Sequence, residues 1–257
     1  MSSRFLTVLI DEASFSLAEL APRLRTRQAN RVHALELCRQ FRRRGIASLL
    51  LRGEARSLHR DLQRSGAAYA EYLTWASDEH KASSKASPFF DAVACGDGTA
   101  AALIASRTAV DPKLDEEYED DFIYMRWLMG RFYLRQQDAS LDMMLGRYEV
   151  LLDGAEDARA LICQALRRGD SEKFDTALQT LIQQREDDYA SGIEADQILE
   201  EEWATEGKVF VEGLALLRLA AQLGLEIQRD YLFIPSLALR SAAASYAAAA
   251  WSNPNAP

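Results

Sequence analysis

The stretch GKVFVEGLALLRLAAQLGLEIQRDYLFIP, residues 207–235, constrains the fold of this chain more than any other. If residues 209–223 form a helix, the polar side chains next to and within it share a stripe about 120° wide, and the remaining surface is apolar or small. Other elements must contact such a helix on several sides. Gly224 follows in the position of a left-handed C-cap. The sequence therefore predicts a central buried helix near the end of the chain.

The pattern of apolar residues is helical along almost the whole chain. The predicted helices cover residues 27–44, 55–82, 89–95, 99–106, 116–135, 141–152, 157–168, 170–189, 193–203, 209–223 and 236–251. Residues 5–10 are the one candidate strand, and a short helix or an extended arm fits them equally well.

Three glycine–acid dipeptides separate predicted helices: Gly53-Glu54, Gly96-Asp97 and Gly169-Asp170. The glycine can end one helix and the acid can cap the next, as in an αα-hairpin. Their unequal spacing fits no regular repeat. We expect an all-α fold, an irregular stack of antiparallel helix hairpins around the central helix. Residues 1–257 form one domain or two closely packed halves (1–110 and 111–251), with a disordered tail at 252–257.

Composition and motifs exclude several classes of protein. No apolar run approaches the 18–20 or so residues of a membrane span, and the apolar start is too short for a signal peptide. Cys38, Cys95 and Cys163 are widely spaced, as expected for buried thiols in a reducing compartment, so we expect a cytoplasmic protein. The three histidines have no metal-ligand spacing, and phosphate-loop and nucleophile-elbow motifs are absent from the sequence. We expect no catalysis, no cofactor and no metal.

Acidic residues form two runs. In residues 111–121, the spacing of Glu116, Glu117 and Asp120 resembles the magnesium motif of helical terpenoid synthases, but the second metal motif of those enzymes is missing. Nine further acids lie between Glu186 and Glu206. Each run is either a solvated face or a surface for a basic partner, since unbalanced like charge repels.

Charge also differs between the two ends of the chain. Residues 1–64 carry thirteen arginines and six acids, a balance of +7, whereas the rest carries 17 basic and 33 acidic residues, a balance of −16. This asymmetry indicates either an interaction surface or attraction between parts of one fold. Inside the predicted helix 116–135, Arg126 lies on an apolar sector, where it either pairs with Glu212 of the central helix or extends to solvent.

The end of the chain resembles immunity protein 49, a family of all-helical antitoxins in bacterial polymorphic toxin systems. The residues that carry the resemblance are Val211, Glu212, Gly213, Leu214, Ala215, Leu216, Leu217, Arg218, Leu219, Ala220, Leu223, Gly224, Tyr231 and Pro235. It is weaker upstream, through Arg147, Tyr148 and residues 160–181, and it does not reach residue 85.

This resemblance implies a non-catalytic immunity protein that binds and neutralises a cognate bacterial toxin. Charge suggests a basic toxin, for which a nuclease is one option; neither nucleic acid nor a membrane is expected as a partner. A helical-hairpin scaffold or adaptor is the alternative, and a helical small-molecule enzyme is less compatible with the missing motifs. The candidate partner-binding residues are Asp115, Glu116, Glu117, Tyr118, Glu119, Asp120, Asp121, Tyr124, Glu200, Glu201 and Glu202.

Overall fold

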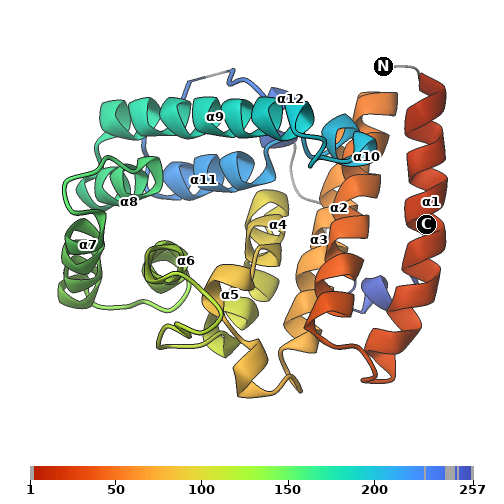
Figure 1. The fold of residues 1–257 in the computed structure, drawn as a ribbon, viewed down its shortest axis with the longest axis horizontal. Helices are drawn as coiled ribbons and strands as arrows, with labels where there is room; N and C mark the ends of the chain where they lie inside the picture. Colours follow the sequence, from red (N-terminus) through yellow and green to blue (C-terminus); the bar gives the residue numbers. More distant parts are fainter. Residues whose placement is uncertain (1–2, 229, 241–246, 248, 256–257) are drawn as a thin grey trace.

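The computed structural model describes residues 3–228, 230–240, 247 and 249–255 (Figure 1). These residues form twelve α-helices and no strand; Tyr231 and Ile234 make one isolated bridge. The all-α prediction is therefore confirmed. The helices are α1 (Ser3–Arg25), α2 (Arg31–Arg52), α3 (Ala55–Tyr72), α4 (Pro88–Cys95), α5 (Gly98–Arg107), α6 (Glu119–Phe132), α7 (Asp138–Leu152), α8 (Ala158–Arg168), α9 (Ser171–Glu194), α10 (Glu200–Ala204), α11 (Val211–Gln222) and α12 (Ser236–Arg240).

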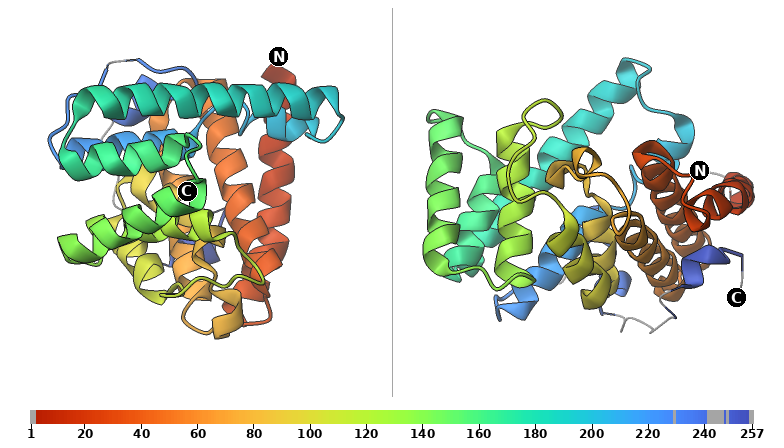
Figure 2. Two further views of the ribbon diagram at one scale, coloured as in Figure 1. Left: turned by 60° about the vertical axis from the view of Figure 1, so that its left-hand side comes forward. Right: turned by 90° about the horizontal axis from the view of Figure 1, so that it is seen from below.

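The long helices α1, α2 and α3 pack side by side at one end of the molecule, and α6 to α9 lie toward the other (Figures 1 and 2). Helices α4 and α5 lie between them, with α4 packed against α3 and α11. One hydrophobic cluster runs through all of these elements, from Leu17 to Trp251. Residues from both predicted halves, 1–110 and 111–251, thus share the same core.

The glycine–acid dipeptides connect helices as predicted. Gly53, Gly96 and Gly169 all end helices in the left-handed conformation, with φ of 69°, 80° and 68°. Asp97 caps α5 by accepting from the Ala100 N–H at 2.9 Å, and Asp170 caps α9 in the same way. At the first connection the Glu54 side chain makes no cap hydrogen bond, so only its glycine acts as expected.

Gly45 does not end a helix, contrary to the prediction for residues 27–44. Helix α2 continues through it to Arg52, and Gly45 is buried against α3. A Cβ atom at this position would lie 3.2 Å from the Leu58 Cα and 3.2 Å from the Asp61 Cβ. The glycine therefore allows two helix backbones to approach closely, a tertiary requirement that the local sequence does not reveal.

Two helices, and not one, occupy the centre of the fold. Helix α11 buries eight of its residues, among them Leu214, Leu216 and Leu217. All eight residues of α4 are buried as well, so the predicted central helix shares the core with α4. The segment PFFDAVAC is too short to show a helical period, so the sequence does not predict that this helix lies at the centre of the fold.

Several predicted boundaries were wrong. Helix α3 ends at Tyr72 and not at residue 82; two 3-10 turns, Asp78–His80 and Ser83–Lys85, follow it. The predicted helix 193–203 reduces to α10, because α9 extends to Glu194. Residues 5–10 belong to α1. The predicted helix 236–251 is seen as α12 and a 3-10 turn, Ala250–Ser252, with residues 241–246 and 248 outside the described residues.

The C-terminal segment packs against the first helices (Figure 2). Trp251 is buried in the core cluster. Pro254 is also buried, and its carbonyl accepts hydrogen bonds from Arg44 of α2 and Arg64 of α3. The expectation of a disordered tail therefore does not hold for residues 252–255; residues 256 and 257 lie outside the described part.

Candidate partner-binding site

A cleft of about 570 Å³ opens where α2, α4, α9, α10 and the start of α11 meet. Helix α2 supplies one wall, with Val32 and Leu35 at its apolar end and arginines further along. The opposite wall comes from Arg185 and Tyr189 of α9 and from the residues that lead into α11. The cleft therefore brings together segments from both ends of the chain.

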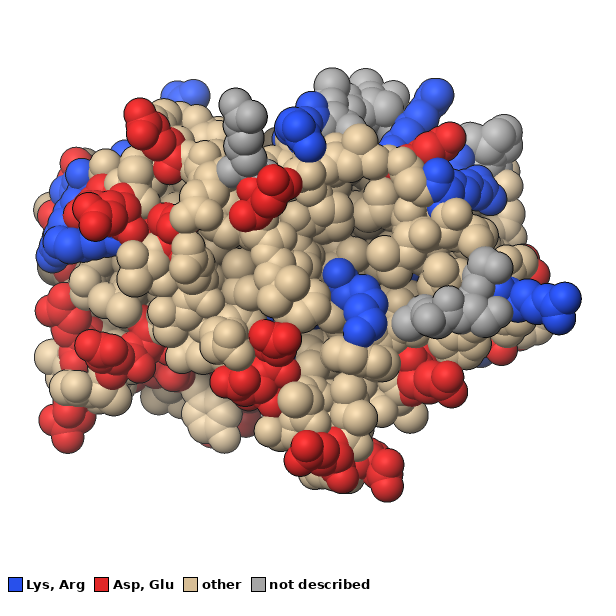
Figure 3. All heavy atoms as spheres, turned by 90° about the horizontal axis from the view of Figure 1, so that it is seen from above, with Lys and Arg blue, Asp and Glu red and all other residues tan. Residues whose placement is uncertain are grey.

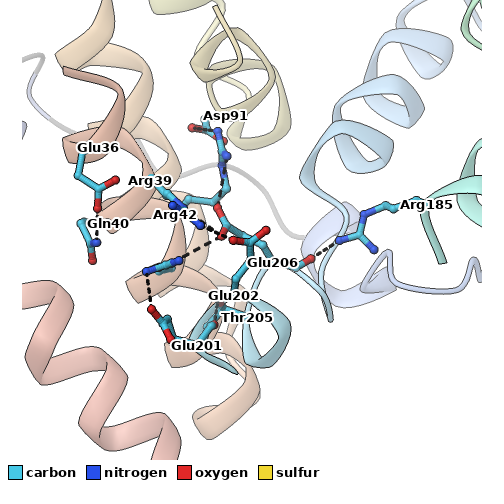
Figure 4. Close-up of polar contacts among 11 residues, drawn as sticks. Glu36, Arg39, Gln40, Arg42, Asp91, Arg185, Glu201, Glu202, Thr205 and Glu206 are labelled. Carbon is cyan, nitrogen blue, oxygen red and sulfur yellow. Dashed lines mark hydrogen bonds and ion pairs between the residues drawn. The ribbon is translucent and has the colours of Figure 1, made fainter. Parts of the chain in front are cut away.

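The arginines of α2 pair with the acidic residues around α10 (Figure 4). Glu206 lies at the centre: its carboxylate is 3.6 Å from Arg39, 3.6 Å from Arg42 and 3.5 Å from Arg43. Arg39 also bonds Glu202. Much of the arginine-rich character of residues 1–64 is thus neutralised inside the fold, which favours the internal explanation of the charge asymmetry.

Arg42 also bonds a buried acid. Its Nε and Nη2 donate to the two carboxylate oxygens of Asp91 at 2.7 and 2.9 Å. Asp91 is fully buried in α4 and also accepts from the Ser65 hydroxyl. Burial acts to lower the pKa of Arg42, but the charge of Asp91, its hydrogen bonds and the charge of Glu206 together outweigh burial, and the pKa is raised. This paired fork fixes the floor of the cleft.

Arg185 is held by aromatic rings. Its guanidinium carbon lies 4.5 Å from the ring centre of Tyr189, 5.0 Å from that of Phe210 and 5.5 Å from that of Phe233. Its Nη2 donates to the Glu206 carbonyl, and burial lowers its pKa. Its Nη1 is buried and has no hydrogen-bond partner among the described residues. Arg185 also borders a smaller cleft of about 300 Å³.

The predicted pair of Arg126 and Glu212 was wrong. Arg126 donates to the Ala105 carbonyl at 2.9 Å. Glu212 accepts from the Tyr124 hydroxyl at 2.8 Å and pairs with Arg159, whose Nε is 3.3 Å away. The Glu212 carboxylate raises the pKa of Arg159, and burial raises that of Tyr124. The acid on α11 therefore bonds Tyr124 of α6 and Arg159 of α8, and not Arg126.

The first acidic run is largely engaged within the fold. Glu116 pairs with Arg31, and Glu119 accepts from two nitrogens of Arg147 at 2.7 Å each. Glu117 is buried and accepts from the backbone N–H of Ser84 at 2.8 Å and from that of Lys113 at 3.0 Å. Glu117 therefore cannot meet a partner unless the loop opens.

The remaining residues of this run divide in the same way. Tyr124 is buried, and Asp121 is 3.2 Å from Arg159. Asp115 is exposed, Asp120 is partly exposed, and Tyr118 exposes 78% of its surface. Of the predicted contact residues in this run, these three are the ones without an ion pair or burial among the residues described.

Sequence reasoning missed the apolar residues next to Tyr118. In the loop between α5 and α6, Val110 and Leu114 are each 67% exposed, and Met143 of α7 is 69% exposed. A groove of about 440 Å³ lies between this loop, α6 and α7. Isolated apolar residues in an acidic loop carry no periodic signal, so only the structure reveals this exposed apolar surface.

Part of the second acidic run borders the cleft. Glu202 lines it, Glu201 lies 3.8 Å from Arg43, and Glu200 is exposed. On the face seen from above, acidic side chains gather along the left and lower edges, basic ones lie mainly toward the upper and right edges, and the surface between is mostly uncharged (Figure 3). The acidic side chains on that face therefore form separate groups and not one continuous patch.

Sequence reasoning also missed the residues that organise the cleft, namely Arg39, Arg42, Arg43, Asp91, Arg185 and Glu206. A signal was present for some of them. Arg39, Arg42 and Arg43 follow helical steps of three and four, as do Glu202 and Glu206 in an acidic segment. The arginines and the glutamates each lie on one face of a helix, and their opposite charges would have suggested that α2 pairs with α10.

Metal-binding clusters and membrane-spanning helices are both missing from the described residues. No group of three or more His, Cys, Asp and Glu side chains there could hold a metal ion. No helix in that part of the chain is long and apolar enough to cross a membrane.

The fold and the comparisons define the class of this protein. A family model described as immunity protein 49 matches residues 42–238, which include most of the cleft and all of α3 to α11. The chain belongs to the immunity protein 49 family. No curated protein and no solved structure matches it.

Proposed function

We propose that this protein is an antitoxin that binds a cognate bacterial toxin and neutralises it. The observation that carries the proposal is the family match over residues 42–238. That match extends well beyond the C-terminal residues that carry the resemblance, and it includes the cleft-lining residues from Arg42 onward, while Val32, Leu35, Glu36 and Arg39 of the α2 wall lie before it. We further propose that the protein acts in the cytoplasm of the bacterium that produces the toxin.

We propose that neutralisation occurs by binding alone. Most charged groups of the cleft, among them Arg39, Arg42 and Glu206, are held in ion pairs, a poor arrangement for nucleophilic chemistry. The thiols support the same conclusion: Cys38, Cys95 and Cys163 are buried, and burial raises the pKa of Cys38 and of Cys95 to about 12. A thiol with so high a pKa is not a nucleophile near neutral pH.

We place the principal toxin contact at the mouth of the cleft. Five carboxylates line the cleft, and Glu36, near Val32, is the one of them without an ion pair among the described residues. Val32 is 71% exposed at the same mouth. The Glu36 carboxylate beside an exposed apolar side chain suits a basic, partly apolar segment of the toxin.

We propose that the exposed residues of the two acidic runs add to this contact surface. Glu200 and Glu201 directly precede the cleft-lining Glu202 in α10. Asp115, Tyr118 and Asp120 lie apart from it, on and beside the loop before α6, where Tyr118 offers a large amphipathic side chain. We rank the cleft first, because most other acids of the first run already have partners within the chain.

The function is tested by expressing the toxin encoded beside this gene, with and without the present protein, in a sensitive bacterial strain. We expect growth only when both are present, and a complex of the two purified proteins on gel filtration. A toxin that kills equally in both cases would contradict the proposal. A stable complex with some other, non-toxic protein would support the adaptor alternative.

The contact surface is tested by charge reversal. Glu36→Lys and Glu200→Lys together should slow toxin association about tenfold or more at low salt, with a smaller effect as salt rises. Glu19→Lys is the matched control, because Glu19 is exposed on α1 away from the cleft. If the double variant and the Glu19→Lys control both bind the toxin at the wild-type rate, the cleft is not the contact surface. Tyr118→Ala tests the second surface separately.

A further inference from the structure

The groove of about 440 Å³ between the α5–α6 loop, α6 and α7 combines apolar walls with a buried charge. On each helix the lining residues follow steps of three and four, so each helix presents one face to the groove. These residues are Glu119, Phe122, Ile123 and Arg126 on α6, Ser140, Met143, Met144 and Arg147 on α7, and Val110, Pro112 and Gln136 beside them. All of them belong to the described part of the chain, and none lines the cleft.

Apolar side chains separate the charged residues of the groove. On α6, the buried Phe122 and Ile123 lie between Glu119 and Arg126 in the sequence. Met143 of α7 and Val110 of the loop are 69% and 67% exposed, so part of this apolar wall is open to solvent. The volume is within the range of small-molecule sites, about 300–1,000 Å³. An apolar chain bound here would remove this surface from water.

Two of the three charged side chains in the groove neutralise each other. Both carboxylate oxygens of Glu119 accept from Arg147, at 2.7 Å each, so this pair adds no net charge. The third charged side chain is Arg126, about two turns further along α6 than Glu119. The electrostatic character of the groove therefore depends on Arg126.

Arg126 has only partial compensation for its charge. It is 8% exposed, and its Nη1 donates to the Ala105 carbonyl in the last turn of α5, which carries the negative end of that helix dipole. This is its one hydrogen bond within the described part of the chain, and no ion pair of Arg126 occurs there.

The acid that acts on Arg126 is Asp111, which is exposed and makes no ion pair with it among the residues described. Burial lowers the pKa of Arg126, and the charge of Asp111 offsets only part of this effect. A carboxylate bonded directly to the guanidinium would compensate it more fully, because a buried charge without a counterion is costly.

We propose that this groove binds a small monocarboxylic acid with an apolar chain. The carboxylate accepts from the nitrogens of Arg126 that do not bond Ala105, and the chain lies along Phe122 and Met143. A carboxylate matches a guanidinium in charge and in the spacing of its two oxygens. A neutral ligand of the same shape would cover Arg126 without compensating it, so the site favours the acid. The inference does not depend on toxin binding.

The test uses the full-length protein without toxin, with octanoate as the probe. Calorimetry at pH 7 compares octanoate with octanamide, which has the same chain without the charge, and with butyrate, which has the same charge on a shorter chain. We expect one octanoate per chain. Octanamide should bind about tenfold more weakly, because it leaves Arg126 without a counterion. Butyrate should also bind at least about tenfold more weakly, because four methylene groups are lost.

Two variants connect binding to the groove. Arg126→Gln removes the charge and should reduce octanoate binding to the level of octanamide; circular dichroism checks its fold, because Arg126 is buried. Met143→Glu places a carboxylate at an exposed position on the groove wall and should weaken octanoate about fivefold, and octanamide less. Phe15→Glu is the matched control: it adds the same charge at an exposed position on α1, and octanoate binding should not change.

The proposal is overturned if octanoate does not bind, if octanamide binds as tightly as octanoate, or if Met143→Glu binds octanoate as the wild type does. If Arg126→Gln fails to fold, Met143→Glu and its control decide the outcome. A short peptide that ends in leucine with a free carboxylate is the last probe. Tighter binding of this peptide than of octanoate would also overturn the proposal, because the groove would then be a docking site for a protein segment.

Discussion

Glu206 is the single residue on which the charges of the cleft depend most. Its carboxylate lies within 4 Å of Arg39, Arg42 and Arg43, and its side chain is only 13% exposed. Arg43 is itself buried, so its charge depends on this acid and on Glu201. Removing the charge of Glu206 leaves partly buried guanidiniums with less compensation.

Glu206→Gln should therefore lower the free energy of unfolding by about 1–3 kcal/mol, since the amide keeps the shape but not the charge. Urea denaturation at pH 7 measures this. Glu200→Gln is the control: its side chain is exposed, and the change should stay within about 0.5 kcal/mol. Equal small effects for both variants would mean that solvent, and not Glu206, compensates the arginines.

Gly66 marks a close contact between α3 and α4. A Cβ atom there would lie 2.8 Å from the Ala92 Cβ and 3.2 Å from its Cα, and neither atom can move without shifting a helix. Gly66→Ala should therefore destabilise the protein by about 1–3 kcal/mol. Gly146→Ala, with open space around it on α7, should stabilise by about 0.5–1 kcal/mol. Thermal unfolding of both variants checks the pair; stabilisation by Gly66→Ala would contradict the close packing.

The pair of Glu119 and Arg147 predicts a pH effect. The hydrogen bonds from Arg147 lower the pKa of Glu119 below its ordinary value of 4.5. Because the folded-state pKa is lowered, the pair stabilises the fold above the pKa of the unfolded chain. That contribution is lost as the pH falls through the folded-state value. In an NMR titration of carboxyl groups, Arg147→Gln should return the pKa of Glu119 toward 4.5.

Arg167→Gln provides the control for that titration. Arg167 lowers the pKa of Asp142 in the same manner, through a hydrogen bond on the neighbouring helix pair. Its removal should raise the pKa of Asp142 and leave that of Glu119 unchanged. A Glu119 that titrates at its ordinary value in the wild type would show that this ion pair does not persist in solution.

At the scale of helices, the caps differ in strength. Asp157 accepts from the Ala160 N–H at the start of α8 at 2.7 Å and from the Tyr148 hydroxyl at 3.0 Å. Asp157→Ala should cost about 1–2 kcal/mol, because both donors lose their acceptor. Glu54→Ala, at the start of α3, should cost less than about 0.5 kcal/mol, since Glu54 makes no side-chain cap bond. Equal costs would show that the Asp157 cap is not formed in solution.

The sequence predicted the ends of helices correctly where the backbone conformation of a few neighbouring residues determines them. Gly53, Gly96 and Gly169 end helices because the backbone there needs positive φ, and this requirement is readable from neighbouring residues. Gly45 and the burial of α4 depend instead on which helix packs against which. No local pattern contains that information, so these two features required the structure.

The same difference between local patterns and tertiary contacts explains which parts of the candidate site the sequence predicted. The acidic runs were visible in the sequence, but the partners of their members were not. Glu117 is buried by the backbone N–H groups of Ser84 and Lys113, and Tyr124 by its contact with Glu212. Reversing the charge of Glu117 would therefore disturb the fold, so this residue is unsuited to a test of toxin binding.

At the scale of the whole molecule, the opposite charges of the two ends of the chain hold them together. Arg31 pairs with Glu116, and the arginines of α2 pair with Glu202 and Glu206 across the cleft. Beside these pairs, α4 packs against α11 within one hydrophobic cluster. Each predicted half, 1–110 and 111–251, thus supplies core residues that the other covers.

The two halves should therefore unfold together, as one domain. Urea denaturation followed by far-ultraviolet circular dichroism and by tryptophan fluorescence should give coincident single transitions, because Trp75 lies in the first half and Trp127 and Trp203 lie in the second. Glu206→Gln should shift both curves to lower urea without separating them, since the shared core would still couple the halves. Two resolved transitions, or curves that separate in this variant, would show that the halves are distinct domains held together mainly by their charges.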